Sequence, residues 1–280
     1  MKNVDSDVVS DFGDEWEKFD QSSVSKMELE NIWKKYFSLF PWNQLSPNAE
    51  GFDLGCGSGR WAYFVAPKVG KLHCIDPAQK ALSVARKTLS SYSNCVFHNV
   101  IVDDIPLEDN SMDFAYSLGV LHHIPNTELG IKKCVEKLKP NAPFLLYLYY
   151  ALDNKPLWFR GIWKMSDILR KGISVLPTKL KYIISQLIAV LIYYPLSKIA
   201  KILENLGFDV SSIPLSFYRD KSLYTMRTDA LDRFGTRLEQ RFTKKEIELM
   251  MINAGLIQIE FREDEPYWCV IGYKKDIGTL

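Results

Sequence analysis

Phe52-Asp53-Leu54-Gly55-Cys56-Gly57-Ser58-Gly59-Arg60 is the stretch of sequence that decides the fold. A short apolar run ends at Leu54, and three glycines then occupy every second position. Glycine has no Cβ and readily adopts positive φ, so backbone N–H groups at such a turn can approach a ligand closely. The positive end of a following helix adds to the attraction for a negatively charged ligand. The stretch therefore predicts a ligand-binding turn between a first strand and a helix.

A dinucleotide-binding turn is the nearest alternative for this stretch. Its fingerprint is G-x-G-x-x-G/A, in which the third small residue lets the helix pack closely on the strand. Here the third glycine, Gly59, comes one residue early, and Arg60 occupies the position that a pyrophosphate site keeps small. The pattern therefore disfavours NAD as the ligand.

The rest of the chain divides into four zones. Residues 1–46 predict a helical arm, and residues 47–150 alternate short apolar runs with amphipathic helices, which is typical of a parallel sheet wrapped by helices. Residues 151–240 interrupt that rhythm as an insertion, and residues 241–280 restore it with a helix and two further apolar runs. The predicted strands are 51–54, 72–75, 95–100, 114–118, 144–150, 257–261 and 267–273, the last two as an antiparallel hairpin.

Composition and charge argue against several classes of protein. The 280 residues are 47% hydrophobic and 25% charged with a formal net charge of +1, so we expect a globular protein without a general electrostatic grip on nucleic acid. The five cysteines are odd in number and form no CxxC pair, which favours reduced thiols in a cytoplasmic protein and no metal site. Residues 1–30 are acidic and lack an apolar core, so no secretory leader is expected.

The glycine turn and the motifs after it resemble the class I S-adenosylmethionine-dependent methyltransferases. The stretch Asp53–Gly59 is similar to their first motif. It is followed in order by Ile75-Asp76-Pro77, Asp104-Ile105-Pro106-Leu107 and Ser117-Leu118-Gly119-Val120-Leu121-His122-His123. Leu138-Lys139-Pro140-Asn141 then precedes the fifth strand, although the family usually has glycine where Asn141 stands. The resemblance covers residues 48–150 and 241–274. It implies a doubly wound, Rossmann-like, seven-stranded and mostly parallel sheet with a C-terminal antiparallel hairpin and a helical cap insertion.

The resemblance also implies a cofactor, S-adenosyl-L-methionine, and the residues that bind it. Gly55, Cys56, Gly57 and Gly59 would curl under its methionine part. Asp53 would orient the turn or meet the cofactor ammonium, and Arg60 would meet its carboxylate unless it forms only a surface salt bridge. Asp76, with Pro77, would hold the ribose hydroxyls, because it ends the second strand 23 residues after Asp53. Capping of the next helix is the alternative role of Asp76, and both roles can hold together.

Further cofactor contacts are implied at later strand ends. Val102 and Asp103 would contact the adenine, with Asp104 as the other carboxylate or a loop-fixing residue. Ser117 and Leu118 would lie at the methionine end, unless they form a plain strand terminus. Trp16, in the N-terminal arm, would fold over the cofactor or anchor the first helix.

His122 and His123 are the candidate catalytic residues. They follow the fourth strand, where acceptors lie in this fold, and histidine ordinarily titrates near neutrality, so one of them is the natural base for a hydroxyl acceptor. The alternative is that one caps the next turn or packs beneath the cofactor.

The insertion is the part of the chain from which we expect the substrate to be chosen. Residues 151–205 carry nine Lys or Arg and three Asp or Glu, with aromatic residues between them. One reading is a helical cap whose basic rim attracts an anionic acceptor. The other is a basic amphipathic helix on a membrane surface, with a lipid-linked acceptor. Apolar residues occupy almost every side of 183–196, which favours burial against protein or a partner subunit, and the run is too short to span a membrane.

The predicted function is therefore methyl transfer to a small molecule, most readily to oxygen. N- or C-methylation, including that of a quinone-like ring, is the alternative, as is a protein that binds the cofactor without turnover. Nucleic-acid methylation is disfavoured, because Ser117-Leu118-Gly119-Val120 stands where an Asn-Pro-Pro-Tyr or Asp-Pro-Pro-Tyr motif would be needed.

Overall fold

The computed structural model describes residues 2–210, 212–276 and 278. They form two compact units. The first unit comprises residues 1–20, 29–151 and 238–280, and the second comprises residues 21–28 and 152–237. The predicted arm is thus shared between the two units, because residues 21–28 belong to the unit of the insertion and the rest of the arm belongs to the unit of the sheet.

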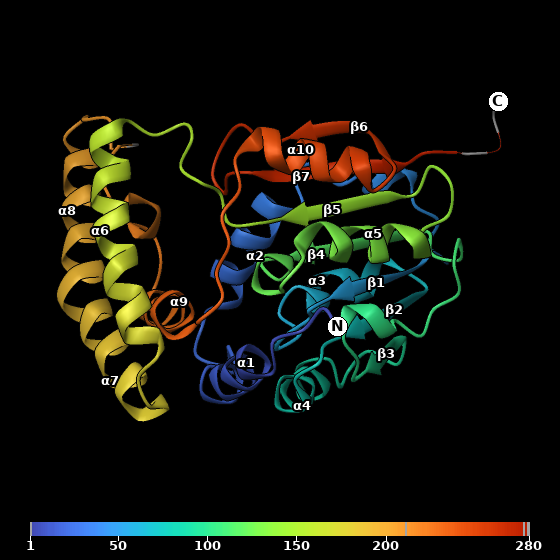
Figure 1. Ribbon diagram of the computed structural model, residues 1–280, viewed down its shortest axis with the longest axis horizontal. Coiled ribbons are helices and arrows are strands. Elements are labelled where there is room, and N and C mark those ends of the chain that lie inside the picture. Colours follow the sequence, from blue (N-terminus) through green and yellow to red (C-terminus); the bar gives the residue numbers. More distant parts are fainter. Residues whose placement is uncertain (1, 211, 277, 279–280) are drawn as a thin grey trace. The chain divides into compact units, whose positions relative to one another are not determined.

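The first unit is an α/β unit around a seven-stranded sheet (Figure 1). The strand order is β3-β2-β1-β4-β5-β7-β6, and only β7 runs antiparallel to its neighbours β5 and β6. The strands are β1 (Glu50–Leu54), β2 (Lys71–Ile75), β3 (Cys95–His98), β4 (Phe114–Leu118), β5 (Pro143–Tyr147), β6 (Leu256–Phe261) and β7 (Cys269–Lys274). The predicted sheet, with its C-terminal hairpin, is confirmed.

The chain alternates these strands with helices. They are α1 (Ser6–Lys18), α2 (Lys26–Tyr36), α3 (Ala62–Val65), α4 (Gln79–Thr88), α5 (Thr127–Lys137) and α10 (Lys244–Asn253), with short 3-10 turns η1 (Trp42–Gln44), η2 (Ala66–Lys68), η3 (Val102–Asp104) and η4 (Leu121–His123). Thr243 and Glu246 form a reciprocal capping box at the start of α10, which satisfies backbone N–H groups that the helix itself cannot.

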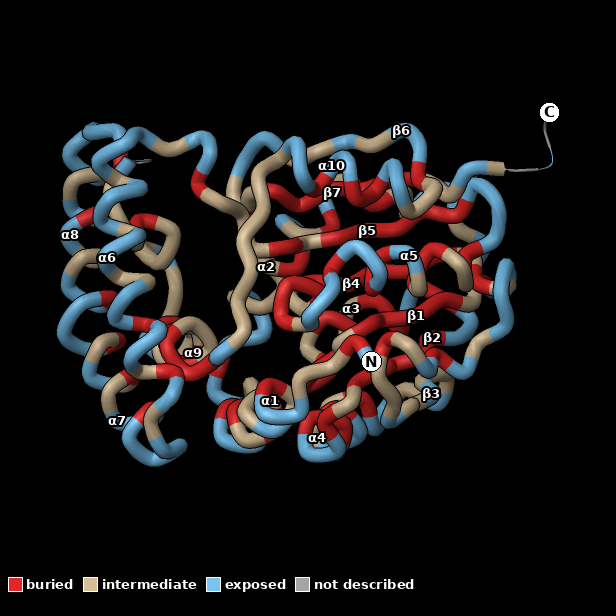
Figure 2. Tube along the Cα trace, in the orientation of Figure 1, coloured by how far each residue is buried: buried red, intermediate tan, exposed pale blue. Residues whose placement is uncertain are grey.

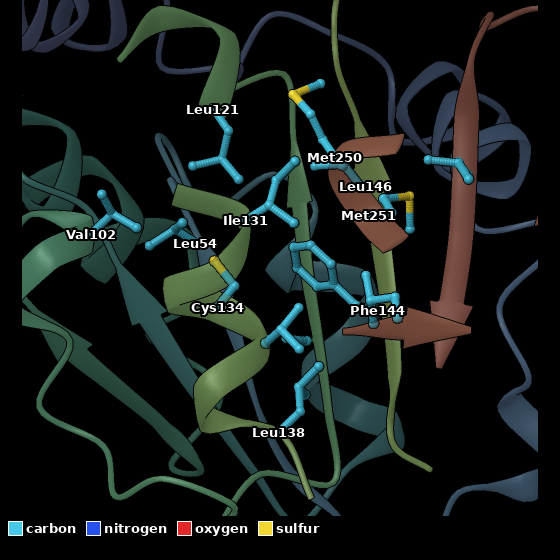
Figure 3. Close-up of a cluster of buried hydrophobic side chains, with 14 of the residues drawn as sticks. Leu54, Val102, Leu121, Ile131, Cys134, Leu138, Phe144, Leu146, Met250 and Met251 are labelled. Atoms are coloured by element: carbon cyan, nitrogen blue, oxygen red, sulfur yellow. The ribbon is translucent and has the colours of Figure 1, made fainter. Parts of the chain in front are cut away.

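Two hydrophobic cores cover the two faces of the sheet. Successive residues of a strand point to opposite faces, so Ala115 joins one core while Phe114 and Tyr116 join the other. The first core packs the sheet against α5 and α10, and Figure 3 shows Phe144 and Leu146 of β5 among side chains of these helices. The second core contains residues of α2, α3 and α4. Strands buried on both faces explain the continuous apolar runs of the sequence.

Asn141 accounts for the one departure from the family's motifs. It lies just before β5 with a φ of +63°, in the left-handed region that glycine adopts most easily. Asparagine tolerates this region better than other side chains, so it replaces the usual glycine at small cost.

The second unit is helical. It contains α6 (Leu157–Ser174), α7 (Thr178–Ile188), a π-helical segment η5 (Ala189–Tyr193), α8 (Tyr194–Asn205), the 3-10 turn η6 (Ser216–Tyr218) and α9 (Leu223–Gly235). Residues Thr178–Asn205 form one continuous helix that, by length and composition alone, is long and apolar enough to cross a membrane. Its small core contains Ala189 and Tyr193 against Met226, Ala230 and Phe234 of α9.

The burial expected for residues 183–196 is found only on one stripe of the helix, which includes Ser185, Ala189 and Tyr193. Ile183, Leu187 and Leu191 are all exposed, and Figure 2 shows the outer sides of α6, α7 and α8 as mostly exposed. The helix buries mainly the small or polar residues of its inner stripe, so its apolar side chains point outward.

Candidate functional site

The glycine turn connects the end of β1 to α3 and has the backbone that its sequence predicts. Gly55, Gly57 and Gly59 have φ values of +75°, +53° and +77°. The N–H groups of Gly55 and Cys56 donate to the carbonyl of Ile75 at 2.7 and 3.1 Å, which ties the turn to the end of β2. A Cβ at Gly55 would clash with Val120, and one at Gly59 would press on Ala85 of α4. The turn thus needs glycine for both conformation and space.

Trp16 of α1 lies against this turn. A Cβ on Gly57 would come within 2.9 Å of the Trp16 indole, so only glycine lets the ring approach so closely. The Arg60 guanidinium lies 5.0 Å from the Trp16 ring and 4.5 Å from the Trp61 ring. Among residues 2–210, 212–276 and 278, Arg60 forms no ion pair, and its guanidinium lies against these two aromatic faces. Trp16 therefore lies where a cover of the turn would lie.

Asp76 follows β2 and holds the glycine turn in place. Its Oδ2 accepts the N–H of Gly57 at 2.9 Å and its Oδ1 accepts the N–H of Ala78 at 2.8 Å, across Pro77. Burial raises the pKa of Asp76 to about 6, against the lowering effect of these two hydrogen bonds. The capping role is thus present. The ribose role stays a prediction, for which each carboxylate oxygen keeps a second lone pair.

Asp53 is buried one strand position before the turn. Its neighbour in register on β4 is Tyr116, a residue that the sequence reading did not single out. Burial raises the pKa of Asp53 to about 8, and the nearby Asp76 raises it further, against the lowering effects of the neighbouring Tyr116 and Arg60. Asp53 is therefore largely uncharged at neutral pH, and a cation placed beside it would restore its charge.

The predicted adenine residues lie in the turn η3. Val102 is buried, and the Asp103 Oδ2 accepts the backbone N–H of Asn3 at 2.7 Å. The Asp103 Oδ1 is buried and accepts no hydrogen bond from the described part of the chain, so it is available to an amino donor. Asp104 is exposed and pairs with Lys2 at 3.0 Å. The geometry favours Asp103 over Asp104 as the ligand-facing carboxylate.

Ser117 and Leu118 end β4. The Ser117 hydroxyl is buried and donates to the carbonyl of Leu54 at 3.0 Å, so it joins β4 to β1. This is the plain strand-end role that the sequence reading kept as the alternative for the pair. Leu118 is buried as well, and a contact of its backbone with a ligand stays a prediction.

His122 and His123 lie in η4, directly after β4, and both are buried. The centroid of the His122 ring lies 4.0 Å from the centroid of the His123 ring and 3.9 Å from that of the Tyr149 ring. Neither His122 ring nitrogen has a hydrogen-bond partner among the described residues. Burial, followed by the nearby His123 and Arg241, lowers the pKa of His122 well below its ordinary value. The expectation that a histidine here titrates near neutrality is therefore wrong for His122, which stays neutral and can accept a proton only weakly.

The segment 238–242 completes this side of the site. The N–H of Gln240 donates to the carbonyl of His122 at 3.0 Å, and the His123 Nδ1 lies 2.7 Å from the carbonyl oxygen of Leu238. Both contacts hold η4 in position. The hydrogen bond from the N–H of Phe242 to the carbonyl of Tyr149, at 3.0 Å, holds the residues after β5 as well.

A buried charge pair in this segment was missed by the sequence reading. Arg241 donates to Glu239 at 2.8 Å, and its guanidinium carbon lies 5.1 Å from the centroid of the Tyr149 ring. The sequence reading divided the chain between these two residues, with Glu239 near the end of the insertion 151–240 and Arg241 at the start of the restored sheet. The available signal was the return of the chain to the sheet at 241, which places the last arginine of that segment inside the first unit.

The described residues contain no group of three His, Cys, Asp or Glu side chains that could hold a metal ion. All five cysteines are free thiols. The site therefore consists of two parts. One is the glycine turn after β1, with buried acids beside it, and the other is the buried cluster of histidine and aromatic side chains after β4.

The chain is similar to known proteins in sequence and in fold. A family profile described as a methyltransferase domain matches residues 52–141. The chain is 31% identical over 106 residues to phosphoethanolamine N-methyltransferase 2 of Caenorhabditis elegans, which covers 37% of this chain and 24% of that protein. It is 28% identical over 120 residues to the sterol 4-C-methyltransferase strm-1 of the same organism, covering 40% of this chain and 36% of that protein. It is 25% identical over 146 residues to the 2-phytyl-1,4-naphtoquinone methyltransferase of Trichormus variabilis, covering 49% and 62%. The matched stretch thus spans less than two thirds of the length of each of these relatives.

A solved structure resembles nearly the whole chain in fold. A chain from the complex of a methyltransferase activator with a methyltransferase of Haloferax volcanii has a TM-score of 0.55 at 14% identity, and the match covers 96% of this chain and 98% of that one. This likeness concerns the fold alone. Residues 52–141 thus match a methyltransferase domain, and the motifs and strand order around them are similar to those of the class I S-adenosylmethionine-dependent methyltransferases.

Proposed function

We propose that this chain transfers the methyl group of S-adenosylmethionine to a small-molecule acceptor bound beside His122. The observation that carries the proposal is the left-handed turn of Gly55, Gly57 and Gly59 at the carboxyl end of β1, with the buried carboxyls of Asp53 and Asp76 beside it. Ligands of open α/β sheets collect at the carboxyl ends of the strands, and this turn leaves backbone there uncovered by a Cβ.

Each charged group of the site suits one part of that cofactor. Arg60 has no carboxylate partner in the described chain and would bind the carboxylate of the methionine part. Asp53 would take the ammonium, Asp76 the ribose hydroxyls, and the buried Oδ1 of Asp103 the adenine amino group. Trp16 would cover the turn and exclude water from it. Bound S-adenosylmethionine would supply the methyl group from its sulfonium, whose sulfur becomes a neutral thioether.

Oxygen is the first candidate for the accepting atom. A hydroxyl must lose its proton during transfer, and the ring nitrogen of neutral His122 that carries no hydrogen would receive it, since neither ring nitrogen has a partner among the described residues. Nitrogen or carbon is the second candidate, supported by the names of the three relatives, which modify an amine, a sterol carbon and a naphthoquinone. The role of the helical insertion as a cap over the acceptor stays a prediction.

Two measurements test the proposal. Calorimetric titration with S-adenosylmethionine and its demethylated product should show binding that Asp76→Ala weakens by well over tenfold, while the exposed Asp104→Ala leaves it nearly unchanged. Incubation with methyl-labelled cofactor and a metabolite extract should then yield a labelled small molecule, whose NMR spectrum identifies the accepting atom. Binding without any labelled product would instead indicate a cofactor-binding protein without turnover, and absence of binding would refute the site.

A further inference from the structure

The exposed surface of the helical unit carries many apolar side chains, unlike that of an ordinary helix in water. Among the described residues, eighteen of the twenty-five exposed large apolar side chains lie between residues 157 and 208. Met165 and Ile168 of α6 are each 70% exposed, and Leu191 is 67% exposed. A helix in water normally turns such residues toward a core. Soluble proteins rarely leave a contiguous apolar surface of this kind without a binding role.

The inner sides of the same helices carry the polar residues. The buried residues of α6 are Arg170 and Ser174, and those of α7 are Lys181 and Ser185. Arg170 donates to the carbonyl of Thr236 at 3.0 Å, so its charge is satisfied inside the unit. The hydroxyl of Ser185 donates within its own helix. Rotating α6 and α7 to hide their apolar side chains would break the bonds that Arg170 and Lys181 make to the carbonyls of Thr236 and Gly235.

The charge on this surface indicates which kind of partner covers it. Residues 157–208 contain eight Lys or Arg and two Asp or Glu, although the whole chain has a net charge of only +1. Both acids are already in ion pairs, Asp167 with Arg170 and Glu204 with Arg219. Arg160, Lys164 and Lys179 are exposed and form no ion pair among the described residues. A second copy of the chain would bring like charges together, whereas an anionic surface would complement them.

The helix Thr178–Asn205 suits the surface of a bilayer better than its interior. Its longest stretch without a charged residue is 182–197, between Lys181 and Lys198. At about 1.5 Å per residue this stretch is roughly 24 Å long, less than the hydrocarbon core of about 30 Å. Lys181 is also held inside the unit by the carbonyl of Gly235 at 3.2 Å. These features favour a helix that lies at the interface with its charged ends among the headgroups.

From these observations we propose that α6, α7 and α8 dock the protein on a membrane that contains anionic lipids. The exposed leucines and isoleucines enter the acyl boundary, and Arg160, Lys164 and Lys179 bind headgroup phosphates. The docking does not depend on methyl transfer, because it involves only the helical unit. It would place the enzyme beside lipid-soluble acceptors.

Vesicle flotation tests this proposal with the full-length protein. Wild type should float with vesicles of phosphatidylcholine and phosphatidylglycerol in equal parts, and much less with phosphatidylcholine alone. The double variant Leu187→Asp/Leu191→Asp should lose at least tenfold in bound fraction, because both side chains are exposed and their exchange leaves the small core intact. Lys164→Glu/Lys179→Glu should lose about tenfold or more, with a weaker dependence on salt.

Leu249→Asp/Ile252→Asp is the matched control, since both residues are exposed on α10 of the first unit. It should float as wild type does. Calorimetric titration with S-adenosylmethionine should give the same affinity for every variant, which separates a failure of docking from a failure of the cofactor site. Equal flotation of all variants would overturn the proposal. So would a failure of wild type to float combined with a dimer in light scattering that Leu187→Asp/Leu191→Asp converts to monomer.

Discussion

Asp53 is the residue whose charge state the fold changes most clearly. On sequence alone a carboxylate beside a glycine turn is an anion, but burial beside Asp76 raises its pKa to about 8. By holding a proton, Asp53 avoids being a buried, uncompensated charge. A cation that binds beside Asp53, such as the ammonium of the ligand, would lower its pKa and favour the ionised form.

Cofactor affinity should consequently rise with pH. Binding of an ammonium ion next to Asp53 releases its proton, so the association constant should increase by roughly tenfold or more between pH 6 and 7.5. This range lies below about 7.7 to 8.0, where an α-amino group itself begins to lose its charge. Titration calorimetry in buffers of different ionisation enthalpy measures both the affinity and the proton release. Asp53→Asn should bind more weakly with a flatter pH dependence, and Asp104→Asn should behave as wild type. A wild-type affinity that falls over this range would contradict the assignment.

His122 is the second residue whose properties depend on its surroundings. It is neutral because it is buried, and its ring stands in an aromatic cluster with His123 and Tyr149. If it accepts the proton of a hydroxyl acceptor, His122→Asn should lower kcat by about 10² to 10⁴ while the cofactor Kd stays within about twofold. His98→Asn is the control, because His98 is a strand residue paired with His73.

The pH profile separates this role from a simpler one. Since the pKa of His122 lies well below its ordinary value, kcat should show no inflection near pH 6.5 that follows this residue. Turnover at the wild-type rate by His122→Asn/His123→Asn would remove the base altogether. Loss of cofactor binding in the single variant would point to packing beneath the cofactor instead.

At the scale of elements, the turn between β1 and α3 is built jointly with α1. Gly57 has a φ of +53° and faces the Trp16 indole at the distance where a Cβ would clash. The turn and the helix are about forty residues apart in sequence, yet each limits what the other can be. Spacing of glycines predicts the turn, but nothing local predicts the residue that covers it.

Substitution at Gly57 should show this coupling. Gly57→Ala should lower the free energy of unfolding by about 1–2 kcal/mol from its left-handed backbone, and further from the clash with Trp16. Gly255→Ala also has a positive φ, +91°, but its Cβ would meet open space, so it should show only the backbone cost. Chemical denaturation of these variants, alone and with Trp16→Ala, completes the comparison. We expect Gly57→Ala and Trp16→Ala to be non-additive by on the order of 1 kcal/mol, and Gly255→Ala and Trp16→Ala to be additive. Additivity in both pairs would show that the indole does not pack on the turn.

At the scale of the whole molecule, the buried acids link folding to pH. Asp53 and Asp76 have pKa values of about 8 and about 6 in the folded chain, above the ordinary value of 3.8. The folded state then binds more protons than the unfolded state between about pH 4 and pH 8. Their contribution to the free energy of unfolding must therefore fall as pH rises through this window.

Asp53→Asn should remove the larger part of this dependence. The difference in free energy of unfolding, wild type minus variant, should fall by on the order of a few kcal/mol from pH 4 to pH 8. Urea denaturation at several pH values, followed by circular dichroism, measures it. A constant difference over the window would mean that Asp53 is ionised in the folded protein. A rising difference would mean that folding lowers the pKa of Asp53 instead of raising it.

The sequence by itself determined the sheet, the turn and the family. Alternating apolar runs place strands at nearly the observed bounds, since strands buried on both faces must be continuously apolar. The three glycines fix the turn, because backbone conformation there is a short-range property. The acids and histidines at strand ends meet at one edge of the sheet, because the carboxyl ends of parallel strands lie together.

Only the tertiary structure decided the charge of Asp53 and His122, the contact of Trp16 with Gly57, and the direction in which the insertion's helices face. Burial and pKa depend on residues distant in sequence, such as Tyr116 and Arg241, and no local pattern contains them. For residues 183–196, an apolar surface all around a helix shows that something must cover it, but not what does. Only the pairing of Arg170 and Lys181 with α9 and the residue after it, Thr236, fixed the inner side and left the apolar side chains outward.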